Sequence, residues 1–256
     1  MKATAPILSC EKVTVAFDGF KAVNGMDLRL MPGELRFLIG PNGAGKTTML
    51  DVICGKVKPA SGTLRFKGDI DISRKKEYQI AELGIGRKFQ APSIFAGLTV
   101  YENLELAMSQ NRSVLATLRA RLSKEDRLKI SRQLDMIGLA HRSELLAGGL
   151  SHGEKQWLEI GMMLMQEPML LLLDEPVAGM TDTETEKTGE LLREITKRQT
   201  VVVVEHDMEF VRSYATTVTV MHEGRLLKEG TMQEVQEDDI VSEVYLGHGR
   251  DARAVG

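Results

Sequence analysis

One segment of this 256-residue chain combines glycines, a lysine and a threonine in an order that can hold phosphate groups. The pattern G-x-x-x-x-G-K-[ST] is matched by Gly40-Pro41-Asn42-Gly43-Ala44-Gly45-Lys46-Thr47. Glycines let backbone N–H groups turn toward one anion, and a following helix directs its positive N-terminus at the same anion. We expect Lys46 to reach the β and γ phosphates and the Thr47 hydroxyl to bind Mg²⁺, with Thr48 beside them. Because no third glycine follows, the segment is not a dinucleotide fingerprint; it fits a kinase, a GTPase, an ATPase or a connector without a ligand.

A second chemical signal is an apolar run that ends in two carboxylates. The run reads Met169-Leu170-Leu171-Leu172-Leu173-Asp174-Glu175-Pro176. In phosphate-loop enzymes an acid at this position holds Mg²⁺, a role that we assign to Asp174, and a second acid can polarise the attacking water, a role for Glu175. Neighbouring strand side chains point to opposite faces, so both can serve one site only at the strand end, where Pro176 turns the chain. Exposed acids without a chemical role are the alternative.

The sequence predicts the elements that must position these groups. Val13–Phe17 alternates between apolar and polar or small residues, as in a half-buried strand, and Leu28–Leu30 repeats this pattern. Leu35–Ile39 is almost continuously apolar, as a strand buried on both faces requires. Thr47–Ile53 has helical character. The phosphate segment therefore lies between a strand and a helix.

The second half of the chain changes from helices to alternating strands and helices. Apolar residues recur at helical spacing from about residue 100 to residue 165. Met169–Leu173 then predicts a buried strand, Glu184–Lys197 a helix and Val201–Val204 a further strand. Strand, helix and strand in this order imply parallel neighbours joined by crossover helices. The pattern therefore predicts an α/β fold with a mostly parallel sheet.

A chain of this length can bury one large core. We expect a single domain over residues 1–247, with the core at 1–89 and 159–247 and an α-helical subdomain inserted at 90–158. The tail, residues 248–256, is expected to be flexible.

The composition narrows the classes of function. With 33 basic and 36 acidic residues, the formal net charge is −3, so no basic field favours nucleic acid. No apolar run approaches the roughly 18 residues of a membrane-spanning helix, and the start does not resemble a secretory signal, so we expect a cytoplasmic protein. Cys10 and Cys54 are 44 positions apart and are expected to be reduced thiols, Cys54 in the core.

Five further features occur in the order of one known family. They are a variant of the LSGGQ signature at Leu150-Ser151-His152-Gly153-Glu154, the Q-loop glutamine at Gln90, the switch histidine at His206, the D-loop aspartate at Asp182 and the adenine-stacking aromatic at Phe17. Together with the phosphate segment and the acidic strand end, they make the sequence resemble the ATP-binding subunits of ABC transporters over about residues 7–230.

The resemblance implies a RecA-like P-loop NTPase core, an N-terminal antiparallel β subdomain and the inserted helical subdomain. It also implies a head-to-tail dimer, with an identical copy or a related ATPase subunit, that encloses two MgATP. Each ATP would lie between the phosphate segment of one copy and Ser151–Gly153 of the other. Gln90 would touch Mg²⁺ and the attacking water, while His206 would complete the catalytic side with Glu175.

The same resemblance implies partners. Transmembrane permease subunits would hold the chain at the inner face of the cell membrane, and a solute-binding protein would act on it indirectly. Nucleic acid is not expected as a partner.

The variant signature is compatible with a second, purely structural use. Ser151-x-x-Glu154 is also a capping box, in which Glu154 reaches back to the Ser151 amide. A carboxylate directed at a γ-phosphate would repel it, which favours the inward orientation. His152 replaces a glycine and is either neutral surface or a modifier of dimer closure.

Finer similarity indicates the importer branch for branched-chain amino acids and urea. Gly86–Gln90, Leu98–Leu104 and Glu205–Met208 resemble that branch in general. Ser151–Met162 and Glu175–Asp182 are most similar to the ATP-binding subunits of urea importers. The ATPase never contacts the solute, so this assignment rests on similarity alone, and a branched-chain amino acid importer is the alternative.

Other classes of function stay open at this stage. A soluble ABC ATPase of iron–sulfur assembly, translation or DNA repair shares the motifs, although translation and repair members typically carry two cassettes or long coiled-coil insertions. A small-molecule kinase shares the phosphate segment but leaves the signature and Gln90 unexplained. An ATP-binding regulator without turnover is disfavoured because Glu175 and His206 are both present.

Overall fold

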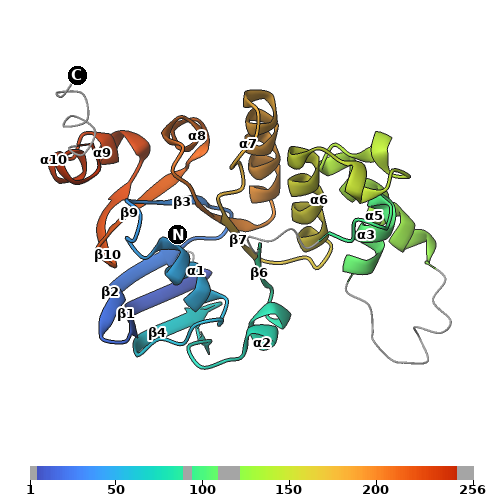
Figure 1. Ribbon diagram of the computed structural model, residues 1–256. Coiled ribbons are helices and arrows are strands. Elements are labelled where there is room, and N and C mark those ends of the chain that lie inside the picture. The colour runs from blue at the N-terminus through green and yellow to red at the C-terminus, as the bar shows by residue number, and fades with distance from the viewer. Residues whose placement is uncertain (1–4, 89–93, 109–121, 247–256) are drawn as a thin grey trace, which may run out of the picture. The chain divides into compact units, whose positions relative to one another are not determined.

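The computed structural model describes residues 5–88, 94–108 and 122–246 (Figure 1). The fold divides into two compact units. The first takes in the described residues of Met1–Arg87, Met169–Pro176 and Leu192–Gly256, and the second those of Lys88–Pro168 and Val177–Leu191.

The first unit is built on a six-stranded sheet whose strand order is β10-β9-β3-β8-β7-β6. Its strands are β3 (Leu35–Ile39), β6 (Ile85–Arg87), β7 (Leu170–Asp174), β8 (Thr200–Val204), β9 (Thr217–His222) and β10 (Arg225–Gly230). Five strands are parallel and β10 pairs antiparallel with β9. Every residue of β3, β7 and β8 is buried, as central parallel strands require. The predicted α/β fold with a mostly parallel sheet is confirmed.

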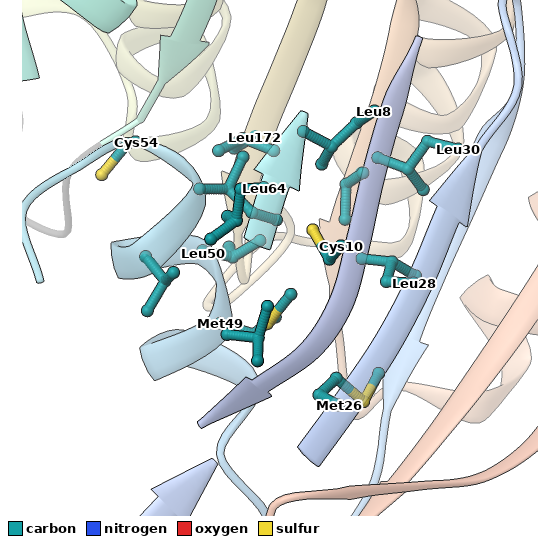
Figure 2. Close-up of a cluster of buried hydrophobic side chains, with 14 of the residues drawn as sticks. Leu8, Cys10, Met26, Leu28, Leu30, Met49, Leu50, Cys54, Leu64 and Leu172 are labelled. Atoms are coloured by element: carbon teal, nitrogen blue, oxygen red, sulfur yellow. The ribbon is translucent and has the colours of Figure 1, made fainter. Parts of the chain in front are cut away.

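A second, antiparallel sheet of the same unit has the order β2-β1-β4-β5. Its strands are β1 (Leu8–Phe17), β2 (Phe20–Leu30), β4 (Ser61–Phe66) and β5 (Ile70–Asp71). The helix α1 (Lys46–Ile53), which follows the phosphate segment, contributes Met49 and Leu50 to one buried cluster with Leu64 of β4 and Leu172 of β7 (Figure 2). The helix behind the phosphate segment is thus fixed by apolar packing.

Short helices complete the first unit. They are α2 (Glu77–Glu82), α8 (Met208–Tyr214), α9 (Met232–Gln236), α10 (Asp239–Val241) and the π-helix η3 (Ser242–Leu246). Cys10 and Cys54 are buried free thiols, as predicted, and burial raises the pKa of the Cys10 thiol.

The second unit is helical. It contains α3 (Val100–Ala107), α5 (Lys124–Met136), α6 (His152–Leu164), the 3₁₀ turns η1 (Ala140–Arg142) and η2 (Ala147–Gly149), and the first part of α7 (Asp182–Thr196). Gly161 lets α6 pack closely, because an added Cβ would lie 2.7 Å from Ile137 Cδ1 and 3.2 Å from Leu104 Cδ2. No described helix is both long and apolar enough to cross a bilayer.

Each of the two units combines segments that are separated in the sequence. Residues 159–168 and 177–191 lie in the helical unit, although residues 169–176 between them belong to the first unit. The helix α6 continues through residue 158 to Leu164, and Trp157 Nε1 donates a 2.9 Å hydrogen bond to Thr188 Oγ1 of α7. The single domain over residues 1–247 and its subdomain limits stay a prediction, and the tail at 248–256 lies outside the described residues.

Candidate functional site

The phosphate segment forms a tight loop between β3 and α1. Gly40 and Gly45 have φ values of +146° and +96°, which L side chains rarely adopt. An added Cβ at either position would also collide with a backbone carbonyl, that of Met221 beside Gly40 and that of Ala22 beside Gly45. Glycine is therefore required at both positions by conformation and by space.

The Lys46 ammonium lies over this loop. Its Nζ donates hydrogen bonds of 2.7 Å to the Gly40 carbonyl and 3.0 Å to the Pro41 carbonyl. Burial lowers the pKa of Lys46, and the carboxylates of Glu175 and Asp174 oppose that shift. The loop thus holds one cation against its own backbone carbonyls.

A hollow of about 320 Å³ opens beside the loop. It is lined by Phe17, Phe20, Ala22, Asn42, Gly43, Ala44, Gly45, Lys46, Thr47, Thr48, Glu175 and Val204. Phe17 and Phe20, paired across β1 and β2, are 48% and 68% exposed. Two exposed aromatic rings next to a phosphate loop can stack on a base. Phe17 was predicted from the sequence and Phe20 was not, although the short Phe17–Phe20 hairpin could have indicated it.

Asp174 and Thr47 provide oxygen ligands at the edge of the loop. The Thr47 hydroxyl donates a hydrogen bond to the Asp174 carboxylate. Burial raises the pKa of Asp174, while this hydrogen bond and the guanidinium of Arg87 oppose the shift. Mg²⁺ prefers oxygen ligands and commonly takes one or two carboxylates together with substrate phosphates. The Thr47 and Asp174 side chains therefore fit the predicted Mg²⁺ role.

Glu175 leaves the strand in a left-handed conformation, with a φ of +49°. Its backbone N–H still donates to the Val204 carbonyl at 2.9 Å, so the turn begins at Glu175, one residue before the Pro176 named by the sequence analysis. The turn brings Glu175 to the hollow beside Asp174. His206, after β8, has its Nδ1 3.5 Å from Glu175 Oε1. The structure thus places an acid and a histidine together at the carboxyl ends of two parallel strands.

In the second unit, Ser151 is the N-cap of α6. Glu154 N donates to Ser151 Oγ at 3.2 Å, and Ser151 N donates to Glu154 Oε2 at 2.9 Å. The other oxygen of Glu154 lies 3.3 Å from Nε of Arg142. The capping box proposed from the sequence is present, and Glu154 is turned toward its own helix.

A second acid that the sequence analysis missed lies against the same turn. Ser151 Oγ donates to Glu184 Oε1 at 3.1 Å, and an added Cβ on Gly153 would lie 2.5 Å from the same oxygen. Hydrogen bonds donated by Thr181, Ser151 and Gly153 hold the pKa of Glu184 below its ordinary value. The capping pair Thr181-x-x-Glu184 was the available signal.

Two other predicted residues of the variant signature and the D-loop lie near this turn. His152 has its Nε2 3.1 Å from the Ala178 carbonyl oxygen. Asp182 is exposed and opens α7 directly after Thr181.

The predicted site residues therefore divide between the two units. The phosphate loop, Phe17, Asp174, Glu175 and His206 come together in the first unit. Ser151, Gly153 and Asp182 belong to the second unit. Gln90 lies outside the described residues.

A larger hollow of about 870 Å³ lies elsewhere in the first unit. It is lined by Cys10, Glu11, Lys12, Asp27, Leu28, Arg29, Ser61, Gly62, Thr63, Leu226 and Glu229. None of the predicted site residues lines it, so size alone does not identify the functional site here.

Comparison with known sequences shows clear relatives. The sequence model of the family described as "ABC transporter" matches residues 23–178. The high-affinity branched-chain amino acid transport ATP-binding protein LivG of Escherichia coli strain K12 is 34% identical, and the match covers 94% of this chain and 98% of LivG. The corresponding protein BraF of Pseudomonas aeruginosa is 33% identical with the same coverage.

Solved structures agree with these relatives. The ADP conformation of MJ1267, an ATP-binding cassette of an ABC transporter, superposes with a TM-score of 0.83 at 32% identity. That match covers 95% of this chain and 100% of MJ1267. A dimeric post-hydrolysis state of the ATP-binding cassette MJ0796, bound to ADP and Pi, gives a TM-score of 0.73 at 25% identity, covering 88% and 98% of the two chains.

We predict that Glu154→Gln changes ATP turnover by less than about twofold. An amide can accept the same hydrogen bond from the Ser151 N–H, and the charge pair with the half-exposed Arg142 contributes at most about 1 kcal/mol. Phosphate release and thermal unfolding of wild type and variant measure both effects. Glu154→Ala is the control that removes the cap, and we expect it to lose about 0.5–1 kcal/mol of stability. A large change in turnover for Glu154→Gln would show that this side chain senses the nucleotide.

Proposed function

The chain belongs to the ABC transporter family of ATP-binding proteins, and we propose that it is the MgATP-hydrolysing subunit that drives an importer of a small solute. The observation that carries the proposal is the meeting of Lys46, Asp174, Glu175 and His206 at one edge of the parallel sheet. A loop that holds phosphate, an oxygen pair for Mg²⁺ and an acid for water are the parts that phosphoryl transfer to water requires.

The first proposed step is the binding of the triphosphate. Backbone N–H groups of Gly40–Thr47 and the start of α1 hold the β and γ phosphates, and Thr48 assists. The Lys46 ammonium exchanges the neutral carbonyls of Gly40 and Pro41 for phosphate oxygens. Phe17, with Phe20 beside it, stacks on adenine. When bound, Mg²⁺ neutralises phosphate charge, with Thr47, Asp174 and Gln90 as its protein contacts.

The second proposed step is the activation of water. Glu175 lines the same hollow as Lys46 and is half-exposed, so its carboxylate can accept a proton from a water molecule near the γ-phosphate. His206 lies beside Glu175 and completes this side of the site. Glu175 lies one residue after β7 and His206 two residues after β8, so the sheet restrains the backbone close to both groups.

The proposed working form is a head-to-tail dimer, with an identical or related ATPase subunit. The phosphate loop of one copy and the Ser151–Gly153 turn of the other would enclose each ATP, with Asp182 in the same interface. The positive N-terminal end of α6 favours an anion, which supports this use. Permease subunits of the membrane would be the direct partners at its inner face, and a solute-binding protein an indirect one.

For the solute we propose urea. The support is the similarity of Ser151–Met162 and Glu175–Asp182 to the ATP-binding subunits of urea importers. A branched-chain amino acid is the second candidate, favoured by the 34% identity to LivG. The ATPase subunit does not contact the solute, so only transport itself separates the two.

We predict that Lys46→Ala weakens ATP binding about 10- to 100-fold, because a charge-assisted contact to phosphate contributes about 1.5–3 kcal/mol. Equilibrium binding of a fluorescent ATP analogue in the presence of Mg²⁺ measures the change. Lys197→Ala, which removes an exposed lysine paired with Glu194, is the matched control. Unchanged affinity in Lys46→Ala would contradict the phosphate-loop assignment.

We predict that Glu175→Gln still binds ATP but hydrolyses it about 10²- to 10⁴-fold more slowly, since an amide cannot take the proton from water. The variant should accumulate as an ATP-bound dimer. Phosphate release and size-exclusion chromatography with MgATP measure both effects. Glu167→Gln is the control, because Glu167 has a similar left-handed φ of +53° but lies in the second unit. Wild-type turnover in Glu175→Gln would remove Glu175 as the base.

We predict that deleting the gene abolishes uptake of radiolabelled urea and leaves leucine uptake unchanged. Complementation with wild type should restore uptake, and complementation with Glu175→Gln should not, which ties transport to hydrolysis. Loss of leucine uptake instead would identify the second candidate. Retention of both activities would contradict an importer and favour a soluble ABC ATPase.

A further inference from the structure

Arg87 occupies an unusual place beside the proposed Mg²⁺ site. It is the last residue of β6 and pairs with Leu172 of the neighbouring β7. Its side chain is only 6% exposed, although it carries a permanent charge. A buried guanidinium needs acidic partners, and the identity of those partners indicates what Arg87 does.

The partners of Arg87 within the described part of the chain include groups from two parts of the ATP site. Nη1 contacts Asp51 Oδ1 directly and lies 3.3 Å from Cys54 Sγ, both on or at the end of α1. Nη2 lies 3.8 Å from Asp174 Oδ2 at the end of β7. Asp51 is one helical turn after Thr47. The guanidinium therefore links the helix behind the phosphate loop to the acid at the strand end.

The two oxygens of Asp174 have different surroundings. Oδ2 is buried and has no hydrogen-bond partner among the described residues, and the carboxylate also faces the Thr47 side chain. The side chain of Asp174 is 4% exposed. The Arg87 guanidinium faces Oδ2 at 3.8 Å, a distance that allows charge attraction without a hydrogen bond. This attraction at one oxygen favours one rotation of the carboxylate about its final bond.

We propose that Arg87 is a positioning residue that orients Asp174 for Mg²⁺. The inference rests on the proposed function of Asp174. Groups behind a metal ligand commonly set its orientation, and their loss typically reduces metal affinity about 10- to 100-fold. Arg87 does this through a rigid fork with two acidic neighbours, which a single ammonium cannot reproduce.

A competing effect has the opposite sign, because a positive charge beside a metal ligand repels Mg²⁺. Two observations decide between them. The guanidinium contacts Asp51 more closely than Asp174, so its charge is largely balanced by that of Asp51. Lys56, the other cation near Asp51 at 3.4 Å, is 54% exposed and screened by solvent. The net field of the Asp51–Arg87 pair at the site is therefore small, and orientation dominates.

ATPγS is expected to raise the midpoint temperature of thermal unfolding. The experiment measures this rise at increasing concentrations of Mg²⁺. We expect Arg87→Met to raise the Mg²⁺ concentration for half of that rise about tenfold. Arg87→Lys should show an intermediate shift. Affinity for ATPγS in EDTA, measured by calorimetry, should be unchanged, which separates a metal effect from a general loss of structure.

A double variant covers the case in which Arg87→Met fails to fold. Combining Asp51→Asn with Arg87→Met removes both charges of the Asp51–Arg87 ion pair, so Asp51 is not left as an acid without its partner. We expect it to keep the raised Mg²⁺ midpoint, because the fork that orients Asp174 is still missing. Lys56→Ala, which removes a cation that contacts Asp51 alone, is the matched control and should behave as wild type.

The outcomes separate this inference from the proposed function. Suppose that Asp174→Asn shifts the Mg²⁺ midpoint. A wild-type or lowered midpoint in Arg87→Met or in the double variant then overturns the positioning role alone. An unshifted midpoint in Asp174→Asn overturns the metal role of Asp174, and the positioning inference with it.

Discussion

The parallel pairing of β3, β8 and β7 is the constraint on which the site depends. Backbone hydrogen bonds align Leu38 with Val204 and Val204 with Asp174, so three carboxyl ends of strands lie at one edge. In parallel α/β sheets this edge is where ligands bind. The phosphate loop follows β3 directly, Asp174 ends β7 with Glu175 next to it, and His206 comes two residues after β8. Their meeting therefore requires only that the strands pair in this order and that both faces of the sheet be buried.

The site carries conformational cost that the rest of the unit must support. Glu175 has a left-handed φ without being a glycine, at a cost of about 1–3 kcal/mol. The Glu175 N–H still donates to the Val204 carbonyl, so the backbone of Glu175 stays bonded to the sheet while its side chain lines the hollow. Asp174 is buried, and Thr47 and Arg87 offset the cost of its charge. The apolar cluster around Met49 and Leu50 keeps α1 in place against these demands.

Local chemistry explains what the sequence could predict. The loop Gly40–Thr47 and the Asp174–Glu175 pair are recognisable because conformation and metal chemistry restrict the residues within one short segment. The capping box at Ser151 follows the same rule. Arg87 was missed because its importance depends on neighbours distant in sequence, whereas Phe20 and Glu184 had local signals, a short hairpin and a capping pair, that were overlooked. Arg87 becomes informative only when β6 pairs with β7 and brings it to Asp174.

Lys46 and the Ser151 turn, the two proposed phosphate-binding elements, differ in the hydrogen-bond acceptor that a phosphate would displace. Lys46 now donates to two neutral carbonyls, whereas Ser151 Oγ donates to the carboxylate of Glu184. Hydrogen bonds to charged groups contribute about 1.5–3 kcal/mol, against roughly 1 kcal/mol for neutral pairs. Exchange at Lys46 is therefore favourable on its own, while exchange at Ser151 replaces one charged acceptor with another and gains little. In the proposed dimer, nucleotide would consequently bind first to the phosphate loop. Engagement of the Ser151 turn would then draw its free energy from the burial of surface between the two copies.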